Sequence, residues 1–439
     1  MKLKNFIIPF VVIFITNAGG VCAGEALEWK ECVREAIKQH PELMTSLEKV
    51  NQAKANKEIT RSAVMPQITG NASETTAKGA AFGSSGGTGQ SDITVSSTRK
   101  PKTTYEYSVT GQQLLFDGFK TSFDLSSAER NIVSSRYNYD VTSSNIRLRL
   151  KTAFSNLLSS QELLKVTEEI EARRKQNLEL VKLRYEGGRE HRGSLLTAEA
   201  DVAQASYDVN QAGRSIYFSQ RQLTKELGRS SFRPMAAKGE LEVKERVSER
   251  PNFDELVETT PFLQQLIAQK EAAKFGLKSA YADFFPQVYA SGNIGNSNVD
   301  AFPDKNEWSG GVSLTLPIFD GGNRFAAVSK AKAVLGQASD DERSGRDSVI
   351  LTLADTWTRL QNTVENVAVQ RKFLEATEER AKIARAEYAI GLMSFDNWII
   401  IENNLASAKK SFVNSEVNSL IAEAGWVQAK GGTLDYDKE

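Results

Sequence analysis

The sequence has few of the residues that form disulfides or bind metal ions. Among 439 residues there are 2 cysteines, 2 histidines and 10 prolines. Cys22 and Cys32 are too few for a disulfide framework, and His40 and His191 lie far apart with no Cys/His cluster around either. We therefore expect no metal site, and the scarcity of proline leaves room for long helices.

Neither the charge nor the motifs indicate nucleic acid binding or catalysis. Lys+Arg and Asp+Glu are both 55, so the balance provides no basic surface for a polyanion. The glycine-rich stretch 83–89 lacks the Gly-Lys-Ser/Thr ending of a phosphate-binding loop, and no Ser, His and Asp residues stand in the context of a catalytic triad. We predict that the protein is not an enzyme, binds no nucleic acid and needs no cofactor.

Long apolar runs are also missing, except at the N-terminus. Residues 1–4 are basic, residues 6–16 are apolar and Val21-Cys22-Ala23 are small, which predicts a signal peptide over 1–23. Cys22 leaves a lipoprotein open as the alternative. An exported chain without an apolar helix of membrane-spanning length can still cross a membrane as β-strands.

The sequence does contain one pattern that occurs twice. Phe116-Asp117-Gly118 and Phe319-Asp320-Gly321 open the two copies, and a tyrosine three residues before a glycine closes each of them. In both copies 69 residues without a proline separate the phenylalanine from the tyrosine (116 to 185 and 319 to 388). A helix of that length measures about 100 Å at about 1.5 Å per residue.

Apolar residues recur every seven positions along both long segments, with one interruption at Glu171. The positions are Leu150, Leu157, Leu164, Leu178 and Tyr185 in the first copy and Leu353, Leu360, Val367, Leu374, Ala381 and Tyr388 in the second. This 3.5-residue period predicts coiled-coil packing. Seven-residue steps resume after each glycine, so we predict an antiparallel helical hairpin in each half. The positions are Leu195, Val202, Val209, Ile216 and Leu223 after Gly188, and Trp398, Leu405 and Phe412 after Gly391.

A strand region precedes each long segment. Prolines 25 residues apart introduce it in both halves (41 to 66 and 261 to 286), and Pro41 predicts a break between two helices. Apolar and small polar residues then alternate, for example over 288–294 and 308–316, and this period of two predicts strands. Residues 78–100 are rich in Gly, Ser and Thr and predict a loop between the first two strands.

These patterns define the domains and the fold class. We predict a first repeat over 24–228, a connector over 229–251, a second repeat over 252–431 and a short tail over 432–439. The fold class is mainly α with a small membrane β-barrel, built from two tandem repeats that each combine a strand pair with long antiparallel coiled-coil helices. Four strands leave unpaired edges, which a membrane does not tolerate. Three chains would supply a 12-stranded barrel, continued by an α-helical tunnel.

The motifs resemble those of the outer-membrane efflux proteins of the TolC-like class. The resemblance covers nearly the whole chain after the signal peptide, and it rests on Pro-Gln-hydrophobic at each strand entry, Phe-Asp-Gly at each strand-to-helix junction and Tyr-x-x-Gly at each hairpin tip. It implies a homotrimer in outer-membrane lipid, with a periplasmic extension that contacts a periplasmic adaptor protein and an inner-membrane transporter. Such a protein is a passive duct.

The resemblance places a periplasmic gate at the hairpin tips. Its candidate residues are Tyr185, Gly188, Ser194, Tyr388, Gly391, Asp396 and Asn397. Tyr388 matches the family's gate tyrosine, whereas Met393, Asn397 and Ser194 replace charged residues of the best-known members. Two alternatives stay open: both tyrosines could pack in the heptad seam, and Asp396 could cap the return helix.

The first tip carries charged residues that suit adaptor docking. We predict Arg189, Glu190, Arg192 and Met393 as adaptor contacts, although an exposed charged turn can equally be only solvated. The sequence does not specify the cargo. A channel for small-molecule efflux, an exit duct for type I protein secretion and a periplasmic coiled-coil scaffold without a pore remain as alternatives.

Overall fold

The computed structural model describes residues 25–78, 101–241, 250–299 and 307–435, so the predicted signal peptide with Cys22 and most of the predicted loop 78–100 lie outside the described residues. The chain divides into two compact units. Unit 1 contains Met1–His40, Leu148–Arg246 and Leu360–Ala424, and unit 2 contains Pro41–Arg147, Val247–Arg359 and Gly425–Glu439. Each unit therefore draws on both halves of the sequence.

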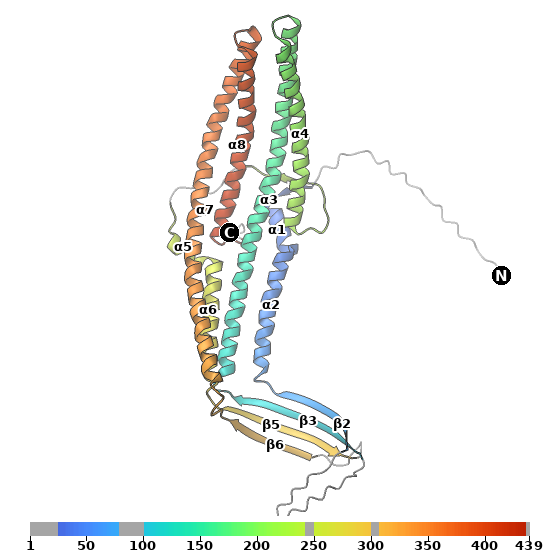
Figure 1. Ribbon diagram of the computed structural model, residues 1–439, viewed down its shortest axis with the longest axis vertical. Coiled ribbons are helices and arrows are strands. Elements are labelled where there is room, and N and C mark those ends of the chain that lie inside the picture. Colours follow the sequence, from blue (N-terminus) through green and yellow to red (C-terminus); the bar gives the residue numbers. More distant parts are fainter. Residues whose placement is uncertain (1–24, 79–100, 242–249, 300–306, 436–439) are drawn as a thin grey trace, which may run out of the picture. The chain divides into compact units, whose positions relative to one another are not determined.

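Two very long helices run through the fold, as the repeated spacing predicted. Helix α3 spans Lys120–Glu186 with 67 residues, and α7 spans Asn323–Ile390 with 68 residues. Each turns back into a shorter helix, α4 (Arg192–Leu227) or α8 (Phe395–Ala429), and forms an antiparallel hairpin (Figure 1). The mainly helical fold class with two hairpins is confirmed.

Glycine ends both long helices in the same way. Gly188 and Gly391 have φ angles of 68° and 87°, which side chains with a Cβ rarely adopt. The next residue then donates its N–H to a carbonyl five positions earlier, Arg189 to Arg184 at 2.8 Å and Leu392 to Glu387 at 2.9 Å. This bonding pattern satisfies helix carbonyls that would otherwise lack partners.

Unit 1 contains a small parallel strand pair that the sequence did not predict. Strand β1 (Glu25–Glu28) pairs with β4 (Met235–Lys238), which lies within the predicted connector 229–251. Helix α1 (Trp29–Gln39) follows β1, and Arg229 bonds Glu35 at 2.5 and 2.7 Å. The connector therefore contains a folded strand.

The short helices of unit 2 begin where the prolines predicted. Helices α2 (Pro41–Ser62) and α6 (Pro261–Ala282) both start at proline, which needs no N–H partner there, and α5 (Phe253–Thr259) precedes α6. Helices α2 and α6 each form an ion pair with a long helix. Lys57 of α2 lies 2.7 Å from Glu129 of α3, and Lys270 of α6 lies 2.6 Å from Glu342 of α7. The break at Pro41 is confirmed.

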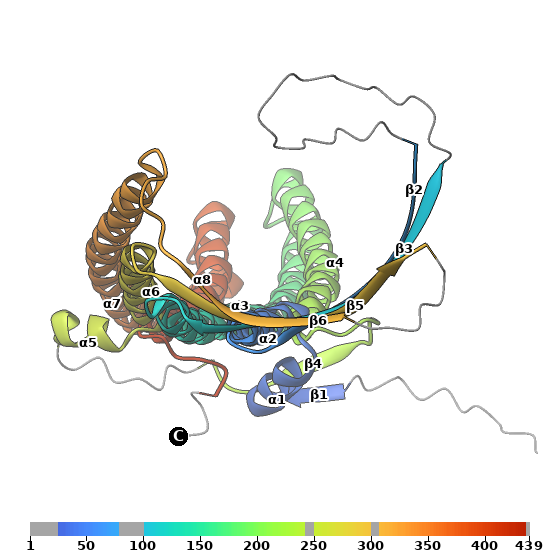
Figure 2. The same cartoon turned by 90° about the horizontal axis from the view of Figure 1, so that it is seen from below.

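The predicted strands form one antiparallel sheet in the order β2-β3-β5-β6. Their bounds are Gln67–Ala77, Lys102–Phe116, Gln287–Asn298 and Glu307–Thr315. The sheet is a curved strip (Figure 2). Within the described residues, β2 and β6 each pair on one side only.

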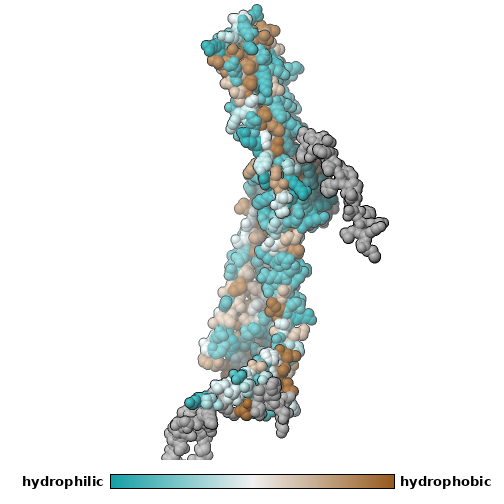
Figure 3. All heavy atoms as spheres, turned by 90° about the vertical axis from the view of Figure 1, so that its right-hand side faces the viewer, coloured by the Kyte–Doolittle hydropathy of each residue, from teal (hydrophilic) through white to brown (hydrophobic). Residues whose placement is uncertain are grey.

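The register of the sheet separates an apolar face from a polar one. Gly70, Val109, Ile294 and Trp308 lie opposite one another in a single row, and the next row is Thr69, Thr110, Asn293 and Ser309. Adjacent rows point to opposite faces. Trp308 is 82% exposed, so it is not packed in a core, and apolar side chains are visible on the sheet in Figure 3.

None of the helices in the described part of the chain is long and apolar enough to cross a membrane. The helices instead bury an apolar seam. Leu150, Leu157, Leu353 and Leu360 of the predicted heptads are fully buried, whereas Tyr185 is exposed. Cys32 is free and buried, and burial raises the pKa of its thiol to about 12.

We predict that Gly228 is required for the end of α4. Its φ angle is 78°, and an added Cβ would lie 2.7 Å from the Gln39 carbonyl oxygen. Gly228→Ala should lower the free energy of unfolding by more than about 2 kcal/mol, because it combines a strained backbone with a clash against main chain. Chemical denaturation of the purified protein measures this change.

The matched control is Gly213 on the same helix, around which nothing lies within 4 Å of an added Cβ. Gly213→Ala should raise the free energy of unfolding by about 0.5–1 kcal/mol. Equal effects of the two substitutions would contradict the role assigned to Gly228.

Candidate functional site: the hairpin tips

The tips of the two hairpins meet around one buried tyrosine. Tyr388, three residues before the glycine that ends α7, has no exposed surface. Its ring stacks on Trp398 of α8 with a centroid distance of 4.1 Å and an interplanar angle of 12°. The Arg184 guanidinium of α3 lies 4.5 Å from the centroid of the same ring. We call Arg184, Glu190, Tyr388 and Trp398 the tip cluster.

Glu190 joins this ring to the first hairpin. The Tyr388 hydroxyl donates to Glu190 Oε2 at 2.9 Å, and the Ser194 hydroxyl donates to Glu190 Oε1 at 2.9 Å. Arg184 also donates to the Tyr388 carbonyl oxygen, and its Nε lies 3.9 Å from Glu190. Since Glu190 lies between α3 and α4 and Tyr388 on α7, these bonds connect the two repeats.

The electrostatic environment keeps the Tyr388 hydroxyl protonated as the donor and the Glu190 carboxylate charged as the acceptor. Burial raises the pKa of Tyr388 well above its ordinary value, and the adjacent Glu190 carboxylate raises it further. Burial by itself would raise the pKa of Glu190. The hydrogen bonds that Glu190 accepts from Ser194 and Tyr388 outweigh this effect of burial, so the pKa of Glu190 lies below its ordinary value. Near neutral pH the phenol therefore stays protonated and the carboxylate stays charged.

Small and apolar side chains from all four long helices surround the ring. They are Val181 of α3, Ala198 of α4, Ala381 and Ala384 of α7, and Phe395, Ile401 and Leu405 of α8. The alanines allow close approach of the helix backbones, while the aromatic rings fill the space between them. The tip is a packed core and not an open turn.

A buried ion pair lies one helical turn beyond the aromatic rings. Glu402, four residues after Trp398, is 3% exposed. Arg173 of α3 donates to its two carboxylate oxygens from Nε at 2.6 Å and Nη2 at 2.8 Å, and Asn177 donates at 3.0 Å. Burial alone would raise the pKa of Glu402, but the bonds from Arg173 and Asn177 lower it. This ion pair is a second link between the repeats.

The predicted tip residues differ in their surroundings. Ser194 is 1% exposed and belongs to the tip through Glu190, whereas Tyr185 is 38% exposed and does not share the environment of Tyr388. Asp396 and Asn397 are exposed. The alternative that Asp396 caps α8 is wrong, because Asp396 lies inside the first turn and the Asn397 N–H faces Ser394 Oγ at 3.4 Å.

The charged run at the first tip is not uniformly exposed. Arg189 and Arg192 are exposed, as expected of docking residues. Glu190 was also predicted as an exposed contact, but only 9% of its side chain is accessible because it turns inward to Tyr388. Met393 is half-buried and packs against the aromatic core of the tip.

Most of the polar partners at the tip could not be predicted from the sequence. Trp398 lay on a predicted heptad, so its burial could have been expected. Arg173, Arg184 and Glu402 carried no comparable signal, because their partners are about 200 residues away in the sequence. Within the described ranges, no group of three or more His, Cys, Asp or Glu residues could hold a metal ion.

Comparison with known proteins gives the class of the chain. The model of the outer membrane efflux protein family matches residues 32–229 and 253–432, so the chain belongs to this family. It is 21% identical over 406 residues to the outer membrane efflux protein BepC of Brucella suis, covering 90% of this chain and 84% of BepC. It is 23% identical over 295 residues to the probable efflux pump outer membrane protein TtgC of Pseudomonas putida, covering 64% of this chain and 59% of TtgC.

Solved structures show the same fold. The likeness to CusC has a TM-score of 0.80 at 17% identity and covers 92% of each chain. The likeness to the open state of MtrE from Neisseria gonorrhoeae has a TM-score of 0.78 at 18% identity and covers 100% of this chain and 99% of MtrE. The chain is thus an outer-membrane efflux channel with a periplasmic helical extension, and it transports without catalysis. Members of its family form trimers within tripartite efflux pumps.

We predict that the Tyr388 hydroxyl stabilises the tip. Tyr388→Phe should lower the free energy of unfolding by about 1.5–3 kcal/mol, because a bond to a charged acceptor is lost inside the core. Tyr185→Phe is the matched control from the other repeat and should change it by less than about 0.5 kcal/mol. If denaturation experiments gave the same loss of unfolding free energy for both variants, the hydrogen bond from Tyr388 to Glu190 would not stabilise the tip.

We also predict that the Arg173–Glu402 ion pair makes stability depend on pH. The folded protein holds the pKa of Glu402 below its ordinary value. The stabilisation is therefore complete above the unfolded pKa of about 4.3 and is lost as the pH falls through the folded pKa. The variant Arg173→Met/Glu402→Met should lose less stability than the wild type when the pH is lowered from 6 to about 3.5.

The control for this pH profile is an exposed pair on α7, Glu379 and Lys382, whose charged atoms lie 3.7 Å apart. The variant Glu379→Met/Lys382→Met should keep the wild-type pH profile, since exposed pairs contribute little.

Arg173→Met alone should destabilise by about 3–5 kcal/mol near neutral pH, because it leaves a buried carboxylate without its cation.

Proposed function

We propose that three copies of the chain form a closed duct across the outer membrane, with a gate at the hairpin tips. One observation carries the proposal: the sheet has two edge strands and an apolar face that lies exposed on a single chain. Joining β2 of one copy to β6 of the next closes a 12-stranded barrel without free edges. The repeats of this duct are residues 24–228 and 252–431, joined by 229–251 and followed by the tail 432–439.

The burial of Tyr388 supports a particular role at the gate. A ring with no exposed surface cannot line an opening, so Tyr388 acts by holding the α7–α8 hairpin against the first hairpin through Glu190. Asp396 and Asn397 are exposed on α8 beside it and are the candidates for lining the aperture. Gly188 and Gly391 set the turns that bring these groups together.

The partners are an inner-membrane transporter and a periplasmic adaptor. Arg189, Arg192 and Met393 lie at the two tips and are the proposed adaptor contacts, and Glu190 supports them from inside the turn. Small molecules are the proposed cargo, because relatives that are 23% identical are named as antibiotic and toluene efflux pump proteins of Pseudomonas putida. The chain spans 59% of the length of those relatives.

Assembly can be tested directly. Outer-membrane fractions should contain a trimer that dissociates on heating, since closure of the sheet requires three copies. A monomer in the soluble periplasmic fraction would instead support a coiled-coil scaffold without a pore.

The gate is tested by single-channel conductance in planar bilayers. Tyr388→Ala combined with Asp396→Ala should raise the conductance several-fold, because the second hairpin loses its link to the first and the aperture loses a polar side chain. Tyr185→Ala, the equivalent change in the first repeat, should leave conductance unchanged. An intact trimer with wild-type conductance in the Tyr388→Ala/Asp396→Ala variant would remove both residues from the gate.

A further inference from the structure

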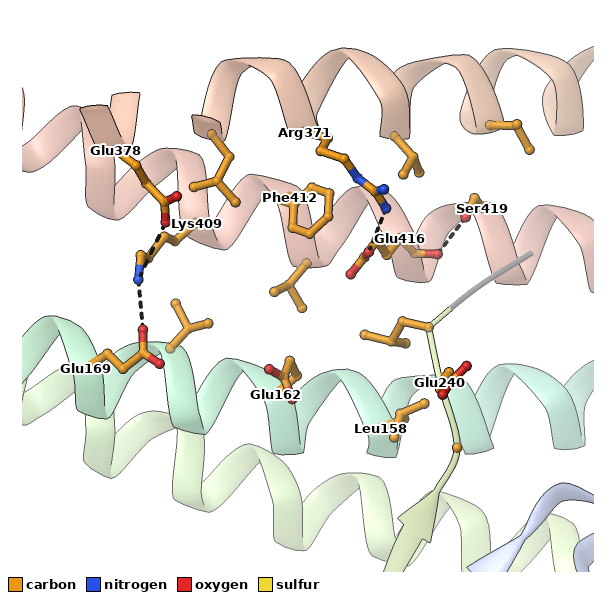
Figure 4. Close-up of a pocket in the computed structure, with 17 residues that line it drawn as sticks. Leu158, Glu162, Glu169, Glu240, Arg371, Glu378, Lys409, Phe412, Glu416 and Ser419 are labelled. Carbon is orange, nitrogen blue, oxygen red and sulfur yellow. Dashed lines mark hydrogen bonds and ion pairs between the residues drawn. The ribbon is translucent and has the colours of Figure 1, made fainter. Parts of the chain in front are cut away.

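A cavity lies beside the helices of unit 1, away from the tip cluster. Its volume is about 790 Å³, and its walls are α3, α7, α8 and the extended residues Gly239–Leu241 that follow β4 (Figure 4). Pockets that bind small molecules have volumes of about 300–1,000 Å³. The cavity is therefore large enough for a compact organic molecule.

One part of the lining is apolar. Val166 of α3, Val364, Val367 and Leu374 of α7, and Phe412 of α8 contribute to it. Arg371 lies 5.6 Å from the centroid of the Phe412 ring, so this ring already faces a cation. An aromatic ring attracts positive charge through its π-face.

The charged part of the lining is strongly acidic. Five carboxylates face two cations, Arg371 and Lys409. Both cations already have partners in the lining: Lys409 lies 2.8 Å from Glu169 and 4.0 Å from Glu378, and Arg371 lies 4.0 Å from Glu416. Among the described residues that line the cavity, no cation pairs with the other two carboxylates, Glu162 and Glu240.

Three of the carboxylates have either a distant cation in the lining or none there among the described residues: Glu416, Glu162 and Glu240. Burial raises the pKa of Glu416, and Glu162 raises it further across the cavity although Arg371 lowers it. Glu162 has its closest cation, Lys165 at 2.9 Å, in the next turn of its own helix. Glu240 forms no ion pair or hydrogen bond in the described part of the chain. A positive charge in this cavity would relieve the repulsion between these groups.

We propose that this cavity binds a compact organic cation with an apolar body. The charged group would lie between Glu162, Glu240 and Glu416, and the body would cover Phe412 and the valines of α7. The apolar lining disfavours a hydrated inorganic ion, which would need oxygen ligands on all sides. This binding site lies along the sides of α3, α7 and α8 and is distinct from the gate at the hairpin tips.

Isothermal titration calorimetry of the purified full chain tests the proposal. The probes are adamantyltrimethylammonium, a permanent cation, and adamantanecarboxylate, an anion with the same apolar body. The cation should bind saturably and the anion should not. Glu162→Gln/Glu416→Gln should weaken binding of the cation about 10-fold, which corresponds to about 1.4 kcal/mol.

The control variant is Glu168→Gln/Glu375→Gln, which removes two exposed carboxylates of α3 and α7 that do not line the cavity. It should bind the cation as the wild type does. Val367→Trp should weaken binding of the cation, because its larger ring would occupy part of the apolar lining that the apolar body of the probe needs. This variant retains all the charges if the carboxylate variant fails to fold. Absence of cation binding, equal binding of both probes, or binding unaffected by Val367→Trp would each overturn the proposal. None of these binding measurements depends on conductance, so they test the cavity independently of the gate proposed at the hairpin tips.

Discussion

The structure depends on one constraint: a helix of 67 or 68 residues cannot bury its own apolar stripe and must be covered along its whole length. At about 1.5 Å per residue each helix extends for about 100 Å, beyond the reach of any single compact core. Short helices cover one part of each long helix in unit 2, and the return helices cover the other part in unit 1. Two repeats of the same plan supply the partners.

A heptad seam covers the helices but does not fix their register. Leucines seven residues apart present nearly the same surface after a slip of one heptad, so apolar packing alone tolerates several alignments. Polar contacts between particular residues of different helices remove this ambiguity. Arg173 meets Glu402 with two hydrogen bonds, and Ser206 donates to Glu171, the one polar residue in the seam. A slipped helix would leave the Glu402 carboxylate buried without Arg173, which is strongly unfavourable.

The sequence was sufficient for the long-range plan of the fold. Proline and glycine positions predicted the break at Pro41 and the turns at Gly188 and Gly391, because these residues act through their own backbone. The strands could be predicted from their alternation of apolar and polar residues. Strands β1 and β4 could not, since four residues such as Met235–Lys238 are too few to show a period. The inward turn of Glu190 was equally hidden, because it depends on a tyrosine 198 residues away.

The two tips show how a duplicated sequence acquires different roles. Tyr185 and Tyr388 occupy equivalent positions, yet one is 38% exposed and the other has no exposed surface. The first repeat provides the charged groups of the contact, Arg184 and Glu190, and the second provides the aromatic groups, Tyr388 and Trp398. This contact needs groups from both repeats, so it exists only while the two hairpins lie together. Separating them would expose two aromatic rings and leave a carboxylate without its phenol partner, and the energy of the closed tip therefore comes mainly from burial that opening would reverse.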